Sequence, residues 1–500
     1  MSSQNPTAAV ANDTAAHYRD IIERYRRALP AGTTSHFRID KLDYVGMPVA
    51  SVTHISEDGT SHYGVGYGAT EEEALVGGFG ELVEEVHLDK SFQELRLEDG
   101  SFRDMQNRHG AEHVVDPLTL VLPAGSLYTP ELPLRWAPIN RLRDDAPCWI
   151  PAEFVSIFAS RVQYPNKLIT SITNGDGAGD TRTRSLLHGT LELLQRDGNA
   201  DSFRALDQGR VLDRRGFPAD IVRMLDDLRA KGLEVIPKLA RVTCGCVSVY
   251  AVGRDHTDDR FPLTLTACGE AADMNYHRAL RKAILECAAS HSRKLFYHSP
   301  FDRKRAITPP GYLDEQIASI RLEDEEDRAV RTLVGWMKMD KSELERKLEN
   351  SVFRHRETVP VAGLPAFGSD DLEDRWQYLQ DQIRQEGLEM YYFAAHTVRN
   401  DVSVTKSIVP GIEMEFGSYH RIGYRGVQRL LDRDDQLVSR QVGLGKKRIL
   451  LPKDKEEALG GPFWLDVQKL DSIIAPLYPL YREPTGHSAR YALESGWFDA

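Results

Sequence analysis

The chain has 500 residues, of which 41% are hydrophobic, so it is long enough to form a large hydrophobic core. Its net charge of −12 argues against a general nucleic-acid-binding protein, which usually has a basic face. No apolar run is long enough to span a membrane, and the first residues lack the charged-then-apolar order of a signal peptide. We therefore expect a cytoplasmic protein without nucleic-acid or membrane partners.

The pattern along the chain predicts alternating helices and strands, which is typical of an α/β or α+β fold. Residues 1–13 are rich in Ser, Asn, Ala and Thr and are expected to form a disordered tail. An amphipathic helix is predicted from Ala15 to Leu29, and strands are predicted between Phe37 and Ile55. Pro48 cannot donate to a strand ladder, so we expect the strand around it to lie at a sheet edge.

One short segment occurs twice, as GVGYGAT at residues 64–70 and as GDGAGDT at residues 175–181, an offset of 111 positions. Each copy predicts a glycine loop followed by a helix. In the first copy, Thr70 is placed as the N-cap and Glu73 as its capping-box partner. An internal pseudo-repeat of glycine-loop and helix units is therefore the main feature of the predicted fold.

Each predicted helix of the repeat carries polar side chains three residues apart, Glu81 and Glu84 in the first copy and Glu192 and Gln195 in the second. Residues at i and i+3 project from one side of a helix, so two neighbouring helices would direct four oxygen-bearing side chains to one place. Such oxygens, together with loop amides and helix N-termini, suit a magnesium–nucleotide complex. The alternative is that the acidic residues form a solvated helix face and the glycines are turn residues. This alternative would be preferred for a single copy, but it does not explain why the same register occurs twice.

A third helix is predicted from Asn275 to about Arg293, with Arg278, Lys282 and Glu286 on one face. A row of this kind is more often a surface ion-pair ladder than a binding site. Upstream, Cys244-Gly-Cys246 lies in a strand-like run and lacks the second cysteine pair that a zinc site needs.

The last two hundred residues show weaker patterns. Residues 300–375 are the most charged part of the chain and predict solvated helical decoration. The stretch from 431 to 500 is a loosely patterned extension with many prolines. We therefore place a catalytic domain at residues 14–430, between the tail and the C-terminal extension 431–500.

Several blocks of the chain resemble the YcaO-domain family. They are LDYVGMPV at 42–49, the two glycine-loop helices, LRW at 134–136, IPA at 150–152, LELLQRD at 191–197, and IVPGIE at 408–413 with Arg421 and Arg425. The resemblance covers roughly residues 15–430 and implies a YcaO-like fold that uses ATP and Mg²⁺. It also implies phosphorylation of a backbone amide oxygen in a ribosomally made peptide. Attack by a side chain, or by external sulfide or an amine, would then give an azoline, a thioamide or an amidine.

The resemblance implies roles for particular residues but singles out no catalytic residue. Magnesium would be bound by Glu81, Glu84, Glu192 and Gln195. ATP would be bound by Gly177, Ala178, Gly179, Asp180, Arg184, Arg196, Lys282 and Glu286.

Three positions depart from the family pattern: Gln195 replaces a Glu, Asp180 replaces an Asn, and Arg184 replaces a Glu. Gln195 keeps an oxygen ligand but loses the anion, so we expect weaker metal binding. Arg184 would either neutralise phosphate in place of a metal or form a surface ion pair.

We expect an ATP-dependent peptide-modifying enzyme that works with a separate protein delivering peptide or sulfur, and that forms a homo-oligomer, a dimer. The C-terminal residues lack the proline-rich end often seen in azoline-forming members, which favours thioamide or amidine formation. The alternative from another class is a non-catalytic YcaO-like subunit that binds a peptide or partner. A third is an acidic metal–nucleotide hydrolase. Retention of Glu81, Glu84, Glu192 and Arg196 favours the peptide-modifying enzyme.

Overall fold

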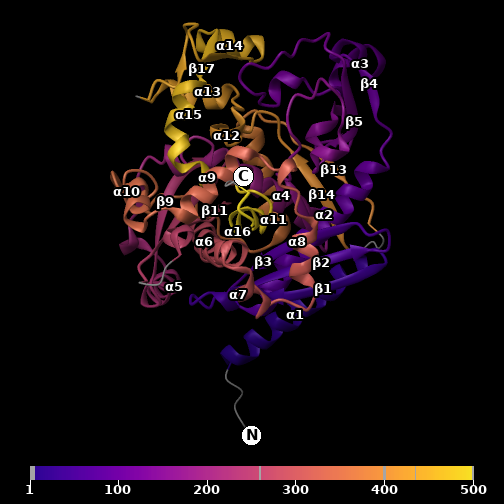
Figure 1. The fold of residues 1–500 in the computed structure, drawn as a ribbon. Helices are drawn as coiled ribbons and strands as arrows, with labels where there is room; N and C mark the ends of the chain where they lie inside the picture. Colours follow the sequence, from indigo (N-terminus) through magenta and orange to yellow (C-terminus); the bar gives the residue numbers. More distant parts are fainter. Residues whose placement is uncertain (1–5, 258–260, 398–400, 434, 498–500) are drawn as a thin grey trace.

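A computed structural model describes residues 6–257, 261–397, 401–433 and 435–497, and it confirms the mixed helix-and-sheet class (Figure 1). The N-terminal helix α1 (Pro6–Ala28) is followed by the antiparallel sheet β1-β2-β3, formed by Gly32–Arg38, Val49–Ser56 and Ser61–Tyr67. The expected tail is therefore wrong for residues 6–13, which are helical. Proline is favoured at the first position of a helix, and the alanines that follow are the best helix formers. Residues 1–5 lie outside the described chain.

The second β-strand of this sheet is central, so the expected edge strand at Pro48 is wrong. β2 begins at Val49 and pairs with β1 on one side and β3 on the other. Pro48 lies just before the strand, where its missing N–H costs no ladder hydrogen bond.

The second sheet has the order β4-β5-β13-β14-β7, with β6 also paired to β5. These strands are Glu98–Gly100 (β4), Leu134–Arg141 (β5), Pro147–Pro151 (β6), Asp176–Gly179 (β7), Tyr391–Ala394 (β13) and Ser403–Ile408 (β14). The two repeat helices are α2 (Glu71–Gln93), which packs on β3 and contacts β7, and α4 (Arg182–Asn199), which packs on β7 and β14. Helix α3 (Phe102–His109) lies beside β4.

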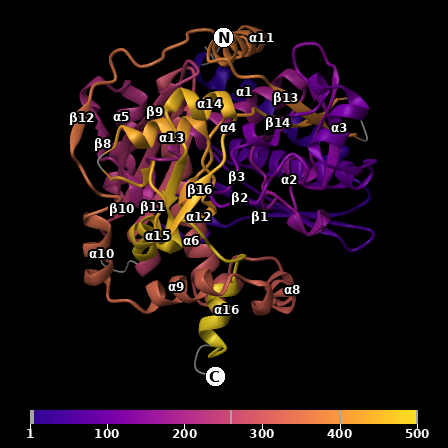
Figure 2. The ribbon, with the colours of Figure 1, turned by 90° about the horizontal axis from the view of Figure 1, so that it is seen from above.

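The third sheet has the order β11-β10-β9-β8-β12. Its strands are Arg210–Leu212 (β8), Leu233–Thr243 (β9), Cys246–Asp255 (β10), Thr266–Asp273 (β11) and Glu357–Val359 (β12), and α5 (Ala219–Ala230) and α6 (Tyr276–His298) pack on it. The Cys-Gly-Cys motif forms the tight β9–β10 turn, because Cys244 and Gly245 both have left-handed φ angles of 47° and 65°. Figure 2 shows this sheet and the β1–β3 sheet on different sides of the molecule.

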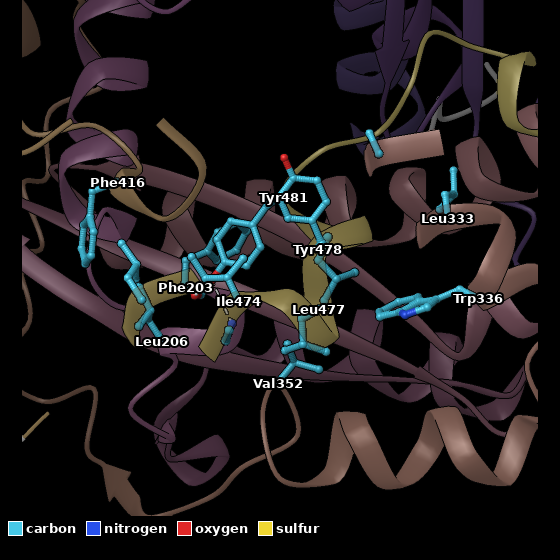
Figure 3. Packing of buried hydrophobic residues seen from close by; sticks show 14 of the residues in the cluster. Phe203, Leu206, Leu333, Trp336, Val352, Phe416, Ile474, Leu477, Tyr478 and Tyr481 are labelled. Atoms are coloured by element: carbon cyan, nitrogen blue, oxygen red, sulfur yellow. Dashed lines mark hydrogen bonds between the residues drawn. The ribbon is translucent and has the colours of Figure 1, made fainter. Parts of the chain in front are cut away.

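The charged segment and the C-terminal extension pack into one hydrophobic core with the rest of the chain (Figure 3). This core contains residues of α9 (Asp327–Lys338), α10 (Lys341–Glu349), α12 (Phe416–Tyr419), α13 (Tyr424–Leu431), β15 (Val438–Ser439), β16 (Lys446–Ile449), β17 (Phe463–Asp466), α15 (Val467–Ile474) and α16 (Ser488–Glu494). The other elements of this part of the chain are α7 (Phe301–Arg305), α8 (Tyr312–Ser319), α14 (Lys453–Leu459) and α11 (Leu372–Gln385), and α11 packs in a separate cluster with α4. Trp336 of α9 and Leu477 beyond α15 belong to this core together with Phe203. The expectation of purely solvated decoration is therefore wrong for α9.

Two glycines of each copy lie in strands, Gly64 and Gly66 in β3 and Gly177 and Gly179 in β7, which corrects the predicted glycine loops. A Cβ atom at Gly66 would lie 2.0 Å from the backbone N of Gly78 on α2, and one at Gly177 would lie 3.1 Å from the backbone N of Gly189 on α4. Gly78 and Gly189 are themselves 111 positions apart. The glycines therefore allow each strand to pack closely against its own helix, a role that requires the absence of a side chain.

Candidate functional site

A cavity of about 860 Å³ lies among the two repeat helices and α6. It is lined by most of the predicted site residues, namely Glu81, Glu84, Ala178, Arg184, Glu192, Gln195, Arg196, Lys282 and Glu286. Gly177, Gly179 and Asp180 are not among its lining residues. The structure therefore brings both Glu-x-x-Glu-type pairs to one place, as the duplicated register predicts.

Backbone amides in or next to β3 and β7 hold three of these carboxylates in place. Glu81 accepts a hydrogen bond from the N–H of Val65 at 2.9 Å, and Glu192 accepts one from the N–H of Gly175 at 3.0 Å. Glu84 accepts one from the N–H of Ala178, in the other copy of the repeat, at 2.7 Å. These amides, which the sequence suggested for phosphate binding, therefore orient carboxylates.

The electrostatics of the cavity favour the entry of a cation. Desolvation raises the pKa of Glu81, and the neighbouring Glu192 raises it further, although the side chain meets solvent within the cavity. The pKa of Glu84 lies well above its usual value because of desolvation and the charges of Asp176, Glu81 and Glu192. A bound cation would relieve this like-charge repulsion.

The carboxylates fit a magnesium ion that also takes ligands from a nucleotide. In the described part of the chain, no group of three or more His, Cys, Asp or Glu side chains is close enough to enclose a metal. Magnesium usually binds one or two carboxylates together with water and substrate phosphate oxygens, which is the ligand set available here.

Arg196 links the two sides of the cavity. It pairs with Glu270 of β11 and, at 3.2 Å, with Glu192. Asn199 donates a hydrogen bond of 2.7 Å to the other oxygen of Glu270, so this carboxylate is fixed at both oxygens. Glu270 is not among the residues predicted from the sequence, because a single acidic residue in a strand carries no spacing signal.

Two cations of α6 face the cavity without partners. In the described ranges, neither Lys282 nor Arg293 forms an ion pair or a hydrogen bond. Arg293 is not among the residues predicted from the sequence, although it follows Lys282 by eleven residues, close to three helical turns, and so lies on the same face of the helix. Free cations at this position are available to bind an anionic ligand.

The other two charged residues of the predicted α6 row have partners elsewhere. Arg278 pairs with Asp370, so the expected surface ladder does not form. Glu286 accepts a hydrogen bond from the hydroxyl of Tyr67 at 3.1 Å. Desolvation and the nearby charge of Glu270 raise the pKa of Glu286 to about 7.

Asp180 and Arg184, two of the three residues that depart from the family pattern, form an ion pair with each other. The Nε of Arg184 donates to Asp180 at 2.8 Å, one turn apart. This geometry favours the surface-pair interpretation of Arg184, because its guanidinium already has an anionic partner.

A side chamber of about 360 Å³ adjoins the cavity and shares Arg196, Phe203, Arg204 and Glu270 with it. Arg204 has a left-handed φ of 56° and stacks over the ring of Phe203 at 4.2 Å. The hydroxyl of Tyr481 donates to the carbonyl of Phe203 at 3.1 Å (Figure 3). The C-terminal extension therefore forms one wall of this chamber.

A family model described as "YcaO cyclodehydratase, ATP-ad Mg2+-binding" matches residues 65–413. The chain therefore belongs to the YcaO family, and the expectation of ATP and Mg²⁺ is confirmed at the level of the family. A relative, an uncharacterized protein of Methanothermobacter thermautotrophicus, is 26% identical over 399 residues, which cover 79% of this chain and 93% of the relative.

Two solved structures share the fold. The YcaO protein from Methanopyrus kandleri bound with AMPPCP and Mg²⁺ has a TM-score of 0.54 at 20% identity and covers 80% of this chain and 92% of its own. A heterocyclase in complex with substrate and cofactor has a TM-score of 0.56 at 15% identity over 79% of this chain. This chain spans only about half, 52%, of that heterocyclase. Among the described residues, no helix combines the length and apolar character needed to cross a bilayer.

Proposed function

We propose that the protein uses Mg²⁺ and ATP to activate a backbone amide of a peptide substrate. The observation that carries this proposal is the single cavity that Glu81, Glu84 and Glu192 line together with the unpaired Lys282 and Arg293. Family membership supports the same reading, since the family is described as ATP- and Mg²⁺-binding.

Each group of the cavity has a distinct proposed role. One or two of the glutamates at a time, with Gln195 as a neutral ligand, would hold Mg²⁺ together with water and phosphate oxygens. Lys282 and Arg293 would contact the phosphates as charge-assisted donors. Arg196, held between two carboxylates, would offer its buried Nε–H, which has no partner in the described structure, as a donor in the cavity.

When bound, ATP would supply a phosphoryl group that turns the amide oxygen into a leaving group. The nucleophile adds to the amide carbon, and the former amide oxygen departs with the phosphate. Nucleophile addition by a neighbouring side chain gives an azoline, whereas external sulfide gives a thioamide and an amine gives an amidine.

The side chamber is the proposed position of the reacting amide. It adjoins the cavity through Arg196 and Glu270 and contains buried polar atoms without partners in the described structure, Ser171 Oγ, Arg204 Nε and Asn199 Oδ1. These supply both donors and an acceptor, which is what an amide requires. A separate protein that delivers the peptide or sulfur, and a dimeric assembly, remain part of the proposal.

Mass spectrometry of a candidate peptide incubated with protein, ATP and Mg²⁺ tests the function. Loss of one water indicates cyclodehydration, and exchange of oxygen for sulfur indicates thioamide formation. Glu81→Gln and Glu192→Gln should each slow product formation about 100-fold, the size expected when a charge-stabilising group is lost.

A non-catalytic subunit is the competing proposal, and it is favoured by the loss of the carboxylate at Gln195. Isothermal titration with ATP, with and without Mg²⁺, separates the two. Nucleotide binding that is absent, or that is indifferent to both glutamate substitutions, would leave the peptide- or partner-binding subunit.

A further inference from the structure

A second large cavity, of about 950 Å³, lies beyond the C-terminal end of α4. This volume is at the upper end of the range of ligand sites in proteins. Asp201 and Ser202 line it. The next residues, Phe203 and Arg204, line the cavity among the two repeat helices and α6, called the nucleotide cavity below. One short segment therefore separates the two cavities, and the proposed chemistry uses none of the residues that line the second.

One wall of this second cavity is the open edge of β9. Residues 240–243 all line it. Successive side chains of a strand point to opposite faces, so four consecutive lining residues show that the strand edge itself borders the cavity. On that edge β8 pairs with β9 only through Val211 and Lys238. Within the described ranges no other strand pairs with that side of β9.

The local sequence keeps this edge open. Gly209, just before β8, has a left-handed φ of 71°, and a Cβ atom there would lie 2.9 Å from the backbone N of Arg356, so the chain turns away before β8 lengthens. In the β9–β10 ladder a register shift between Ser248 and Val249 leaves Ala240 without an opposite residue. A bulge of this kind bends and twists the strand, while its pairing with β10 continues from Arg241 to Thr243.

The charges of the cavity argue against an anionic ligand. Its lining contains six Arg or Lys and six Asp or Glu side chains. Arg241 is bound by both oxygens of Asp201 at 3.0 and 2.8 Å, and Arg425 pairs with Glu386 at 2.9 Å. These arginines are therefore already neutralised, and a nucleic acid or a free phosphate would find no excess of positive charge.

The remaining features complement an extended peptide. An open strand edge offers alternating N–H and C=O groups, which only another extended backbone matches. Val242 on β9 is 47% exposed, and Val114, Val115 and Leu118 lie among the apolar lining residues, so apolar side chains of the peptide would also find contacts.

We propose that this second cavity binds an extended segment of the peptide substrate, which adds as a strand to the edge of β9 beyond Lys238. The identity of the occupant rests on the proposed function. The bound segment would lie outside the reacting amide and would anchor the substrate while another part of it enters the nucleotide cavity.

The test begins with a phage-displayed library of random peptides of about twelve residues, selected against the full-length protein in the presence of a non-hydrolysable ATP analogue and Mg²⁺. An enriched peptide is then synthesised with a fluorophore. Two further versions carry backbone N-methyl groups at alternate positions, one at the odd residues and one at the even residues.

Only alternate N–H groups of an added strand pair with the edge. One N-methylated series should therefore bind at least about tenfold more weakly, since it loses several hydrogen bonds, and the other should bind like the parent. Hydrogen exchange should show protection of residues 240–243. Failure to enrich any peptide, equal binding by both series, or protection confined to another region would overturn the proposal.

Protein variants give a second readout. Val242 and Ile55 are exposed strand residues, at 47% and 38%, so lysine at either position should leave the fold intact. Val242→Lys should weaken peptide binding about tenfold because lysine on an edge strand disfavours strand addition, and Ile55→Lys should not. Equal binding by the two variants would contradict the proposed site.

The two proposals fail separately. Glu192→Gln should lose ATP-dependent modification but retain peptide binding at β9. Peptide bound at β9 without any ATP-dependent product would sink the proposed function and leave the peptide site at β9 standing, with a bound peptide that is not a substrate. Product formed without protection of β9 would support the proposed function and overturn the proposed peptide site at β9.

Discussion

The carboxylate of Glu84 on α2 accepts a hydrogen bond of 2.7 Å from the backbone N–H of Ala178 on β7. This bond crosses between the two copies of the repeat. It fixes the first glutamate pair relative to α4, which begins three residues after the strand that carries Ala178 ends. The site therefore depends on both copies at once, and a change in either copy should affect the shared cavity.

Gln195→Glu should restore the family pattern at a cost in stability without metal. Gln195 is only 4% exposed and lies in a cavity that already contains Glu84 and Glu192. An added carboxylate should lower the unfolding free energy in EDTA by about 2 kcal/mol through like-charge repulsion and desolvation. Mg²⁺ with ATP should recover this loss, as measured by thermal unfolding. Equal stability in EDTA would show that the site does not bring these carboxylates together.

Lys282→Ala and Arg293→Ala should each weaken ATP binding about tenfold or more, because each removes an unpaired cation that faces the cavity. Isothermal titration measures the change. Arg281→Ala is the matched control on the same helix, since Arg281 is already paired with Glu73 at 2.9 Å. It should lower stability by up to about 1 kcal/mol and leave ATP affinity nearly unchanged. If Arg281→Ala weakened ATP binding as much as Lys282→Ala or Arg293→Ala, the assignment of Lys282 and Arg293 as phosphate-binding residues would be contradicted.

Arg184→Ala should change nucleotide affinity less than about threefold, because Asp180 already holds the guanidinium at 2.8 Å. Asp180→Asn should release Arg184 toward the cavity and tighten binding. Titration of ATP into both variants and into the double variant measures the coupling. A tenfold loss in Arg184→Ala alone would mean that Arg184 contacts phosphate directly.

Glu286 should make stability depend on pH. Desolvation and Glu270 raise the pKa of this carboxyl from 4.5 to about 7, so the folded protein holds the proton more tightly than the unfolded chain does. The resulting stability is fully present below about pH 4.5 and is lost as the pH rises to about 7. Glu286→Gln removes this dependence.

The Glu286→Gln variant should therefore be more stable than the unmodified protein near pH 8, by about 1–2 kcal/mol after allowance for solvent in the cavity, and similar to it near about pH 4. Urea unfolding in EDTA at the two pH values measures the difference. Glu315→Gln, at an exposed position of α8, provides the control. A difference of equal size at both pH values would instead reflect lost packing.

The sequence alone predicted the elements whose signals are local. Thr70 caps α2 by accepting a hydrogen bond from the N–H of Glu73 at 3.2 Å, as the capping pattern indicated. The fixed offset of 111 residues also predicted that Glu81 and Glu192 would face one cavity, because a repeated register places equivalent side chains alike. Their metal-binding roles stay a prediction.

Only the tertiary structure decided which groups meet across long sequence distances. Gly177 lies in β7 through its pairing with Thr405, and no side chain fits there because α4 packs too closely, which its neighbours in sequence do not reveal. Glu270 of β11 pairs with Arg196 of α4, 74 residues earlier in the chain. Tyr481 of the C-terminal extension forms part of the wall of the side chamber. Helical periodicity and capping are properties of a few adjacent residues. Close packing, carboxylate pairing and the open edge of β9 depend on how distant segments fold together, so local patterns do not encode them.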